Sequence, residues 1–133
     1  MLGAAVVLAP AAAAERDVIV GEVTTRVARP DMDLGALVRS SLDHALHDME
    51  PRPNGRHVVL SVALQDMAVD ASSRSVTCSV SVALRSGRGG AMFATLEGRA
   101  RVGMASGRST SAEGRAIDAA VRAALARMPE ALR

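Results

Sequence analysis

The chain has 133 residues, enough for one ordinary domain with a modest core and too few for two. Nearly half of the residues are apolar, but a single Phe and no Tyr or Trp leave the core to aliphatic side chains. All 16 cationic residues are arginines, and they alternate with 14 acidic residues for a formal charge of +2. A surface of mixed charge with almost no aromatic residues to stack on bases argues against nucleic acid as a partner.

The first segment, MLGAAVVLAPAAAAERDV, is typical of a secretory leader. Its uncharged apolar run breaks at Pro10 and ends in small residues at positions 12–14, which predicts cleavage after Ala14 and a single mature domain over residues 15–133. The run is too short to span a membrane, which takes about 20 apolar residues. No Lys or Arg precedes Glu15, so three alternatives stay open: a true start further upstream, a degenerate leader, or a disordered alanine-rich tail.

The next two elements are predicted as a strand and a helix. DVIVGEVTTRVA is rich in β-branched residues and indicates a strand, with Gly21 as a candidate bulge. Pro30 ends it, and Asp31 or Asp33 can cap the helix that follows. In LGALVRSSLDHALHDM, apolar residues recur at steps of three and four and predict one buried helical face. These residues are Leu34, Leu37, Val38, Leu42, Ala45, Leu46 and Met49.

Three strands with short connections follow. HVVLSVALQDMAVD, SVTCSVSVAL and MFATLEGRARVGM each alternate apolar and polar residues, and the polar links DASSR and SGRGGA between them predict an antiparallel meander. The apolar registers are Val58, Leu60, Val62 and Leu64 in the first strand, Val76, Cys78, Val80, Val82 and Leu84 in the second, and Met92, Ala94, Leu96, Ala100, Val102 and Met104 in the third.

Cys78 is the only cysteine in the chain. It cannot form an internal disulfide, and it does not directly follow the leader as the anchor cysteine of a lipoprotein does. Because it falls in the apolar register of its strand, we expect a buried, unreactive thiol rather than a nucleophile.

The last helix begins, on this interpretation, with a capping box formed by Thr110 and Glu113. Asp118 and Arg122 have the spacing of a weak ion pair within a helix, and Pro129 marks the expected end. The predicted apolar stripe consists of Ile117, Ala120, Val121, Ala124, Leu125 and Met128.

The order strand, helix, three strands, helix predicts an α+β fold. Two amphipathic helices on one face of a four-stranded, mainly antiparallel sheet form a two-layer sandwich. The other face of the sheet is then polar and faces either solvent or a partner. The first strand, if it pairs at the margin of the sheet, could accept a strand from another protein. The residues we predict for such a partner surface are Thr25, Ser79, Ser81, Arg85, Arg99 and Arg101.

No catalytic constellation is recognisable in the sequence. His44 and His47, three positions apart and flanked by acids, are the best candidates for a metal site, but no second group of ligands lies at a suitable spacing. No serine lies in a nucleophile elbow, and SGRGGA does not open a helix as a phosphate-binding loop does. We therefore predict no catalytic, cofactor or metal residues.

The pattern resembles that of small periplasmic α/β domains of the bacterial cell envelope. DLGALVRSSLDHAL after the first strand, RHVVLSVALQDM and ATLEGRARVG in the sheet, and AIDAAVRAALARMPEAL at the end are similar in order to the N-terminal domain of TolB and to the lipoproteins that activate penicillin-binding proteins. The resemblance implies an envelope protein that binds another protein and is not an enzyme, which is an argument from fold analogy.

We therefore predict an exported, periplasmic or secreted adaptor domain that binds another envelope or secreted protein, without stable membrane insertion once the leader is cleaved. Two alternatives stay open. The first is a carrier of a small apolar or anionic ligand between helices and sheet. The second is a metal-assisted enzyme around His44 and His47.

Overall fold

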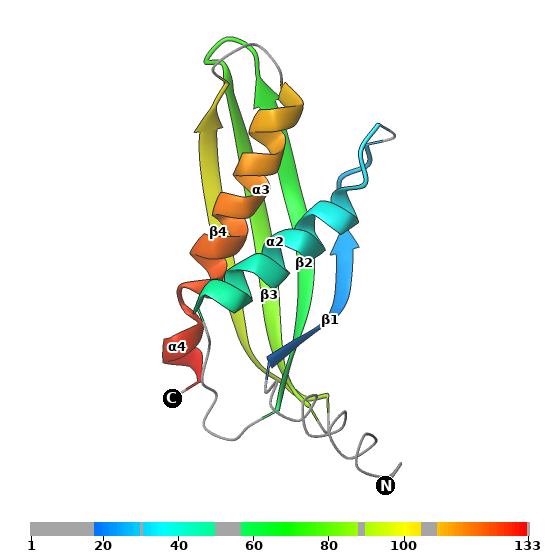
Figure 1. Cartoon of the computed structure of the whole chain (residues 1–133), viewed down its shortest axis with the longest axis vertical. Helices are drawn as coiled ribbons and strands as arrows, with labels where there is room; N and C mark the ends of the chain where they lie inside the picture. The colour runs from blue at the N-terminus through cyan, green and yellow to red at the C-terminus, as the bar shows by residue number, and fades with distance from the viewer. Residues whose placement is uncertain (1–17, 30, 50–56, 88–89, 105–108, 133) are drawn as a thin grey trace, which may run out of the picture.

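The structure is a computed structural model that describes residues 18–29, 31–49, 57–87, 90–104 and 109–132. Two long helices lie on one face of a four-stranded sheet, which confirms the predicted two-layer α+β fold and its order of elements (Figure 1). The predicted leader, residues 1–14, lies outside the described residues.

The elements agree closely with those expected. The strands are β1 (Val18–Thr25), β2 (Val58–Asp70), β3 (Ser75–Ser86) and β4 (Met92–Gly103), and the helices are α2 (Leu34–Met49), α3 (Ser109–Leu125) and the short α4 (Met128–Ala131).

The sheet has the strand order β1-β2-β3-β4. Strands β2, β3 and β4 pair antiparallel and form the predicted meander. Strand β1 pairs parallel with β2, because the chain crosses over through α2 between these two strands. Strands β1 and β4 are therefore the two margins of the sheet.

The predicted bulge in β1 is present. The register with β2 shifts between Val20 and Val23, so Gly21 and Glu22 interrupt the regular pairing. A Cβ atom at Gly21 would lie 2.6 Å from Cγ1 of Val59, so only glycine fits there without a shift.

Helix α2 begins as the sequence predicts. The Asp33 carboxylate accepts a hydrogen bond of 3.0 Å from the backbone N–H of Ala36, which identifies Asp33 rather than Asp31 as the capping residue. The buried face of the helix consists of Leu34, Val38, Leu42 and Ala45, with Leu37, Leu46 and Met49 partly buried beside it.

Helix α3 packs closely on β4 through small residues. A Cβ atom at Gly98 would lie 2.1 Å from the carbonyl oxygen of Ala120 and 2.5 Å from the backbone nitrogen of Ala124. Gly98 is buried, and both alanines are fully buried. The helix backbone therefore lies against the strand where a larger residue in either element would force them apart.

Three details of the sequence-based prediction are wrong. Helix α3 already begins at Ser109, so Thr110 lies inside the helix and not at its N-cap, and the Glu113 carboxylate binds Arg29. The helix ends at Leu125, and Pro129 lies inside α4, where its missing N–H is tolerated in the first turn.

The third error concerns Met92, which we placed in the apolar register of β4. A register shift between Leu84 and Arg85 pairs Met92 with Arg85, whereas Ala94 pairs with Leu84. Because paired residues share a face, this bulge turns Met92 away from the helices, and its side chain is 56% exposed.

Candidate binding surface

Both long helices cover the same face of the sheet, so the opposite face, here called the open face, lacks a covering layer among the described residues (Figure 1). Its centre consists of small side chains on β2 and β3, and its β4 side carries charges. The residues of the open face are Ile19, Thr24, Val59, Ser61, Ala63, Asp66, Ala68, Asp70, Ser75, Thr77, Ser79, Ser81, Ala83, Arg85, Met92, Thr95, Glu97, Arg99 and Arg101.

The structure brings five of the six predicted partner-surface residues onto this open face. Ser79 pairs with Arg99 and Ser81 pairs with Glu97, while Arg101 lies one pair further along β4. Thr25, the sixth, pairs with Leu64 and therefore belongs to the register that faces the helices, at the end of β1. The sequence marks Gly21 as a candidate bulge but does not give the register that follows it, so alternation alone could not place Thr25.

Two arginines of the open face are held by hydroxyl groups rather than by carboxylates. Nε of Arg85 donates to Oγ of Ser61 at 3.2 Å, and its Nη1 donates to the carbonyl oxygen of Gly90 at 3.1 Å. Nε of Arg101 donates to Oγ of Ser75 at 3.2 Å. Neither arginine forms an ion pair with a carboxylate among the described residues, so both guanidinium groups can bind an anionic partner.

One end of the open face is apolar, which the sequence reading missed. Ile19, Val59, Arg85 and Met92 are successive register partners across the four strands. Ile19 is 48% exposed and Met92 is 56% exposed. The register shift between Leu84 and Arg85 exposes Met92, and the alternation of apolar and polar residues in the sequence does not reveal where such a bulge occurs.

The outer margin of β4 carries unpaired backbone groups. The backbone N–H of Met104 donates to the carbonyl oxygen of Arg74 at 2.7 Å, which makes these two residues a hydrogen-bonded pair of the antiparallel ladder. Such pairs alternate along the ladder, so the backbone groups of Glu97, Arg99 and Arg101 point away from β3.

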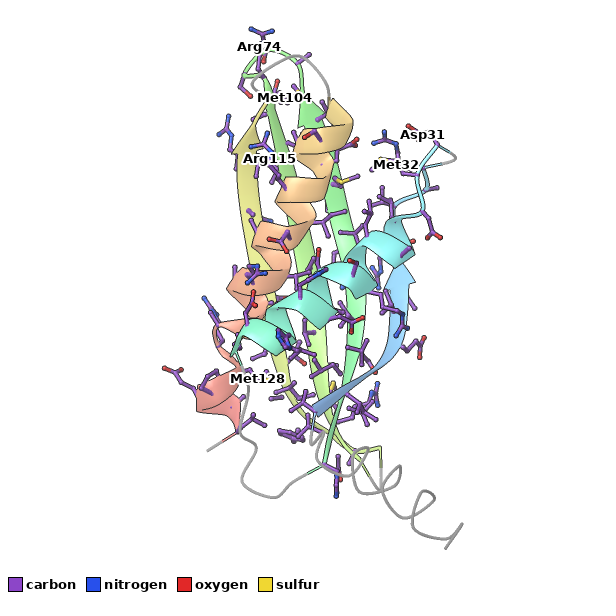
Figure 2. All side chains as sticks on the ribbon, viewed as in Figure 1. Asp31, Met32, Arg74, Met104, Arg115 and Met128 are labelled. Atoms are coloured by element: carbon purple, nitrogen blue, oxygen red, sulfur yellow. The ribbon has the colours of Figure 1, made fainter. Side chains whose placement is uncertain are left out.

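The upper end of β4 is surrounded by arginines from three elements. Arg74 lies in the turn between β2 and β3, and Arg115 lies on α3, where its Nη2 donates to the carbonyl oxygen of Gly103 at 3.0 Å. Figure 2 shows Arg74, Met104 and Arg115 at the same end of the molecule. Arg101 reaches the same end through its bond to Ser75, so three positive charges gather there.

Asp70, the last residue of β2 before that turn, has hydrogen-bond partners of its own. One carboxylate oxygen of Asp70 accepts hydrogen bonds from the backbone and hydroxyl of Ser72 and from the backbone of Ser73. These bonds, those to Ser72 first, lower the pKa of Asp70 from 3.8 to about 2. The carboxylate therefore holds the turn together instead of pairing with Arg74.

Cys78 is fully buried among the aliphatic residues of the core, as predicted. Burial raises the pKa of its thiol from 9.0 to about 11, and the negative charge of Asp66 adds to this effect. A thiol with a raised pKa is a poor nucleophile at neutral pH, so Cys78 contributes to the core rather than to chemistry.

The predicted histidines do not form a site in the described residues. His44 is exposed, and its Nδ1 lies 2.9 Å from the carbonyl oxygen of Ser40 in its own helix. His47 is also exposed on α2. Among the described parts of the chain, no group of three or more His, Cys, Asp or Glu residues is placed to hold a metal ion.

No helix within the described ranges is both long enough and apolar enough to cross a membrane. No protein-family profile matches the sequence, and no curated protein matches it.

Several solved structures share the fold. PelC of Paraburkholderia phytofirmans, solved as a dodecamer, has a TM-score of 0.62 at 18% identity over 84% of this chain and 85% of its own. The hypothetical protein CT253 of Chlamydia trachomatis has a TM-score of 0.62 at 16% identity over 86% of this chain and 96% of its own.

A third neighbour is a candidate lipoprotein of Caulobacter crescentus CB15. It has a TM-score of 0.50 at 17% identity and covers 90% of both chains. At these identities the likeness shows the fold. None of these three neighbours is named as a TolB domain or an activator of penicillin-binding proteins, so that part of the resemblance stays a prediction.

Proposed function

We propose that this protein is an exported, non-catalytic adaptor domain of the bacterial cell envelope that binds another envelope protein through the open face of its sheet. The observation that carries the proposal is the asymmetry of the two-layer fold. Both helices pack on one face, while the other presents small side chains at its centre, exposed arginines along β4 and exposed apolar residues at one end. Arginine and methionine are enriched at protein interfaces, and exposed apolar side chains can serve as anchors for a partner.

The structural neighbours support this proposal on two points. One of them is a candidate lipoprotein, a class that belongs to the cell envelope, and another was solved as a dodecamer, so this fold can take part in protein–protein contacts. The predicted leader supports export. Both arguments are analogies from fold and sequence pattern. The open face is the only evidence for the proposal that comes from the structure of this chain itself.

The proposal is tested by blocking the open face in the native host. Ser81 lies at its centre, so Ser81→Trp should abolish co-purification of the partner after chemical crosslinking of intact cells. Asp43→Trp on the exposed side of α2 is the matched control and should leave co-purification unchanged. Circular dichroism of both variants checks that each is folded.

Two results would overturn the proposal. Equal recovery of the partner with both variants would place the interface elsewhere on the molecule. A stoichiometric small molecule in native mass spectra of the purified protein, with no partner protein under any condition, would favour the ligand-carrier alternative.

A further inference from the structure

We infer that the outer margin of β4, from Glu97 to Gly103, binds an extended acidic segment of the partner protein as an additional strand of the sheet. This inference rests on the proposed protein-binding function and names the chemistry of the partner at one place on the surface. It follows from two independent features of β4, its backbone and its charges.

The backbone of β4 can accept a strand. The N–H and C=O groups of Glu97, Arg99 and Arg101 point outward, and within the described residues no hydrogen bond reaches them. The next outward carbonyl, that of Gly103, already accepts a hydrogen bond from Arg115. An edge strand with a run of open backbone groups is the template for β-augmentation, and Arg115 marks where this run ends.

The opposite margin of the sheet is less suited to this role. The bulge at Gly21 and Glu22 interrupts the regular geometry of β1. Nη2 of Arg39 donates to the carbonyl oxygen of Gly21 at 3.1 Å, so a backbone group in the middle of that strand is already bound. Bulges and covered backbone groups are the usual protection of an edge strand, and among the described residues β4 has neither between Glu97 and Arg101.

The charges at this margin predict an acidic partner. Arg99 and Arg101 lie on the open face two positions apart, with Arg74 and Arg115 at the upper end of the strand. None of these four forms an ion pair with a carboxylate among the described residues. A strand laid along β4 with acidic residues at alternate positions would bring a carboxylate to Arg99 and another to Arg101, and arginine binds carboxylates through two parallel hydrogen bonds.

Glu97 gives the site a boundary. It lies on the open face two positions before Arg99, so it would repel an acidic side chain placed opposite it. The acidic part of the partner should therefore lie between Arg99 and Gly103. Arg99 and Arg101 follow the line of one strand, and exposed acids of β2, Asp66 and Asp70, lie on the same face of the sheet, which fits a strand better than an anionic membrane surface.

The charge part of the inference is tested with synthetic probes on the full chain. The probe is a fluorescein-labelled ten-residue peptide of alternating Glu and Val, and its counterpart has Lys in place of Glu. Fluorescence anisotropy should show binding of the acidic peptide only. The variant Arg99→Glu/Arg101→Glu should weaken its affinity roughly tenfold or more, because two attractive contacts become repulsive. Arg26→Glu, a reversal at an exposed arginine beyond β1, should leave the affinity unchanged.

The backbone part is tested by two substitutions at Glu97. Glu97→Pro removes an outward N–H without breaking the ladder to β3, and Glu97→Gln removes the same charge but keeps the N–H. We expect Glu97→Gln to bind the acidic peptide as well as or better than the natural protein, and Glu97→Pro to bind it several-fold more weakly than Glu97→Gln. Equal affinity of the two variants would overturn strand addition, even if the arginines matter.

The remaining outcomes separate this inference from the proposed function. Binding of phosphatidylglycerol vesicles that depends on Arg99 and Arg101, with no binding of the peptide, would overturn the inference in favour of a membrane surface. If neither probe binds but co-purification still depends on Ser81, the acidic strand is refuted and the adaptor function stands. If co-purification is also independent of Ser81, both are refuted.

Discussion

Arg29 and Glu113 are 84 positions apart in the chain and form a two-pronged ion pair. The Glu113 carboxylate is fully buried near the start of α3, and the Arg29 side chain remains 27% exposed in the segment between β1 and α2. One guanidinium nitrogen of Arg29 lies 3.2 Å from Oε1 of Glu113 and another binds Oε2, while exposed Asp31 binds the same guanidinium. The pair therefore links the segment that precedes α2 to helix α3.

The ion pair predicts an asymmetric response to substitution. Glu113→Gln keeps the shape of the side chain but removes the charge that Arg29 binds, and should lower the free energy of unfolding by about 2 kcal/mol. Asp31→Asn, on the exposed side of the same guanidinium, should change it little. Urea denaturation followed by circular dichroism measures both. Equal effects would mean that burial of Glu113 does not strengthen the contact.

The close approach of α3 and β4 predicts opposite effects of the same substitution at two glycines. Gly98→Ala places a Cβ atom against the backbone of Ala120 and Ala124 and should destabilise the protein by about 1–3 kcal/mol. Gly114→Ala lies in α3 with no atom within 4 Å of the added Cβ, and should stabilise it by about 0.5–1 kcal/mol through helix propensity. Thermal unfolding of the two variants gives the comparison. A stable Gly98→Ala protein would contradict the packing described here.

The thiol of Cys78 predicts a loss of stability at alkaline pH. Its pKa is raised from 9.0 to about 11 by burial, so between these values the unfolded chain has released a proton that the folded protein still holds. Stability due to the neutral thiol is therefore fully present below about pH 9 and declines as the pH rises towards 11. The chain has no Tyr, and all of its cationic residues are arginines, so no Lys or Tyr side chain titrates in this window.

The measurement is the free energy of unfolding from pH 8 to pH 11 for the natural protein and for Cys78→Ala. We expect the natural protein to lose stability across this range and the variant, which has no thiol, to lose much less. The same burial predicts that iodoacetamide modifies Cys78 only after denaturation at neutral pH. Parallel curves for the two proteins would show that the thiol is more accessible than its buried position implies.

The apolar end of the open face gives a prediction about solubility. Ile19 and Met92 are exposed partners of one row across the sheet, and exposed apolar side chains in such a row serve as anchors for a partner or promote aggregation. Met92→Gln should reduce self-association of the isolated protein in analytical ultracentrifugation without changing its melting temperature. A lower melting temperature would mean that Met92 supports the core.

Much of the fold could be predicted from alternation and helical periodicity. The register of Val58 to Leu64 in β2 and the stripe from Ile117 to Met128 in and just after α3 are buried as expected, because burial imposes these periods directly on the sequence. The parallel pairing of β1 could not be assigned, since strand order depends on contacts far apart in the chain. Met92 was misplaced because one bulge shifts a register without leaving a mark in composition.

The candidate site was predicted in part. Alternation alone placed Ser79, Ser81 and Arg99 on one face, and the structure confirms that they lie together there. The partner of Glu113 could not be predicted from nearby residues. Its spacing from Thr110 satisfies the capping-box pattern, but its carboxylate binds Arg29, which is far away in the sequence. Arg115 was missed for the same reason, as only the packing of α3 on β4 brings it to Gly103.

The most direct test of the adaptor function is photocrosslinking in the native host with a probe residue placed in turn at Ser81, Arg101 and Asp43. Ser81 and Arg101 lie on the open face, whereas Asp43 lies on the exposed side of α2. The adaptor function predicts a discrete adduct with one envelope protein from Ser81 and Arg101 and none from Asp43. Adducts from Asp43 alone, or empty lanes from all three with the protein present in the exported fraction, would contradict it.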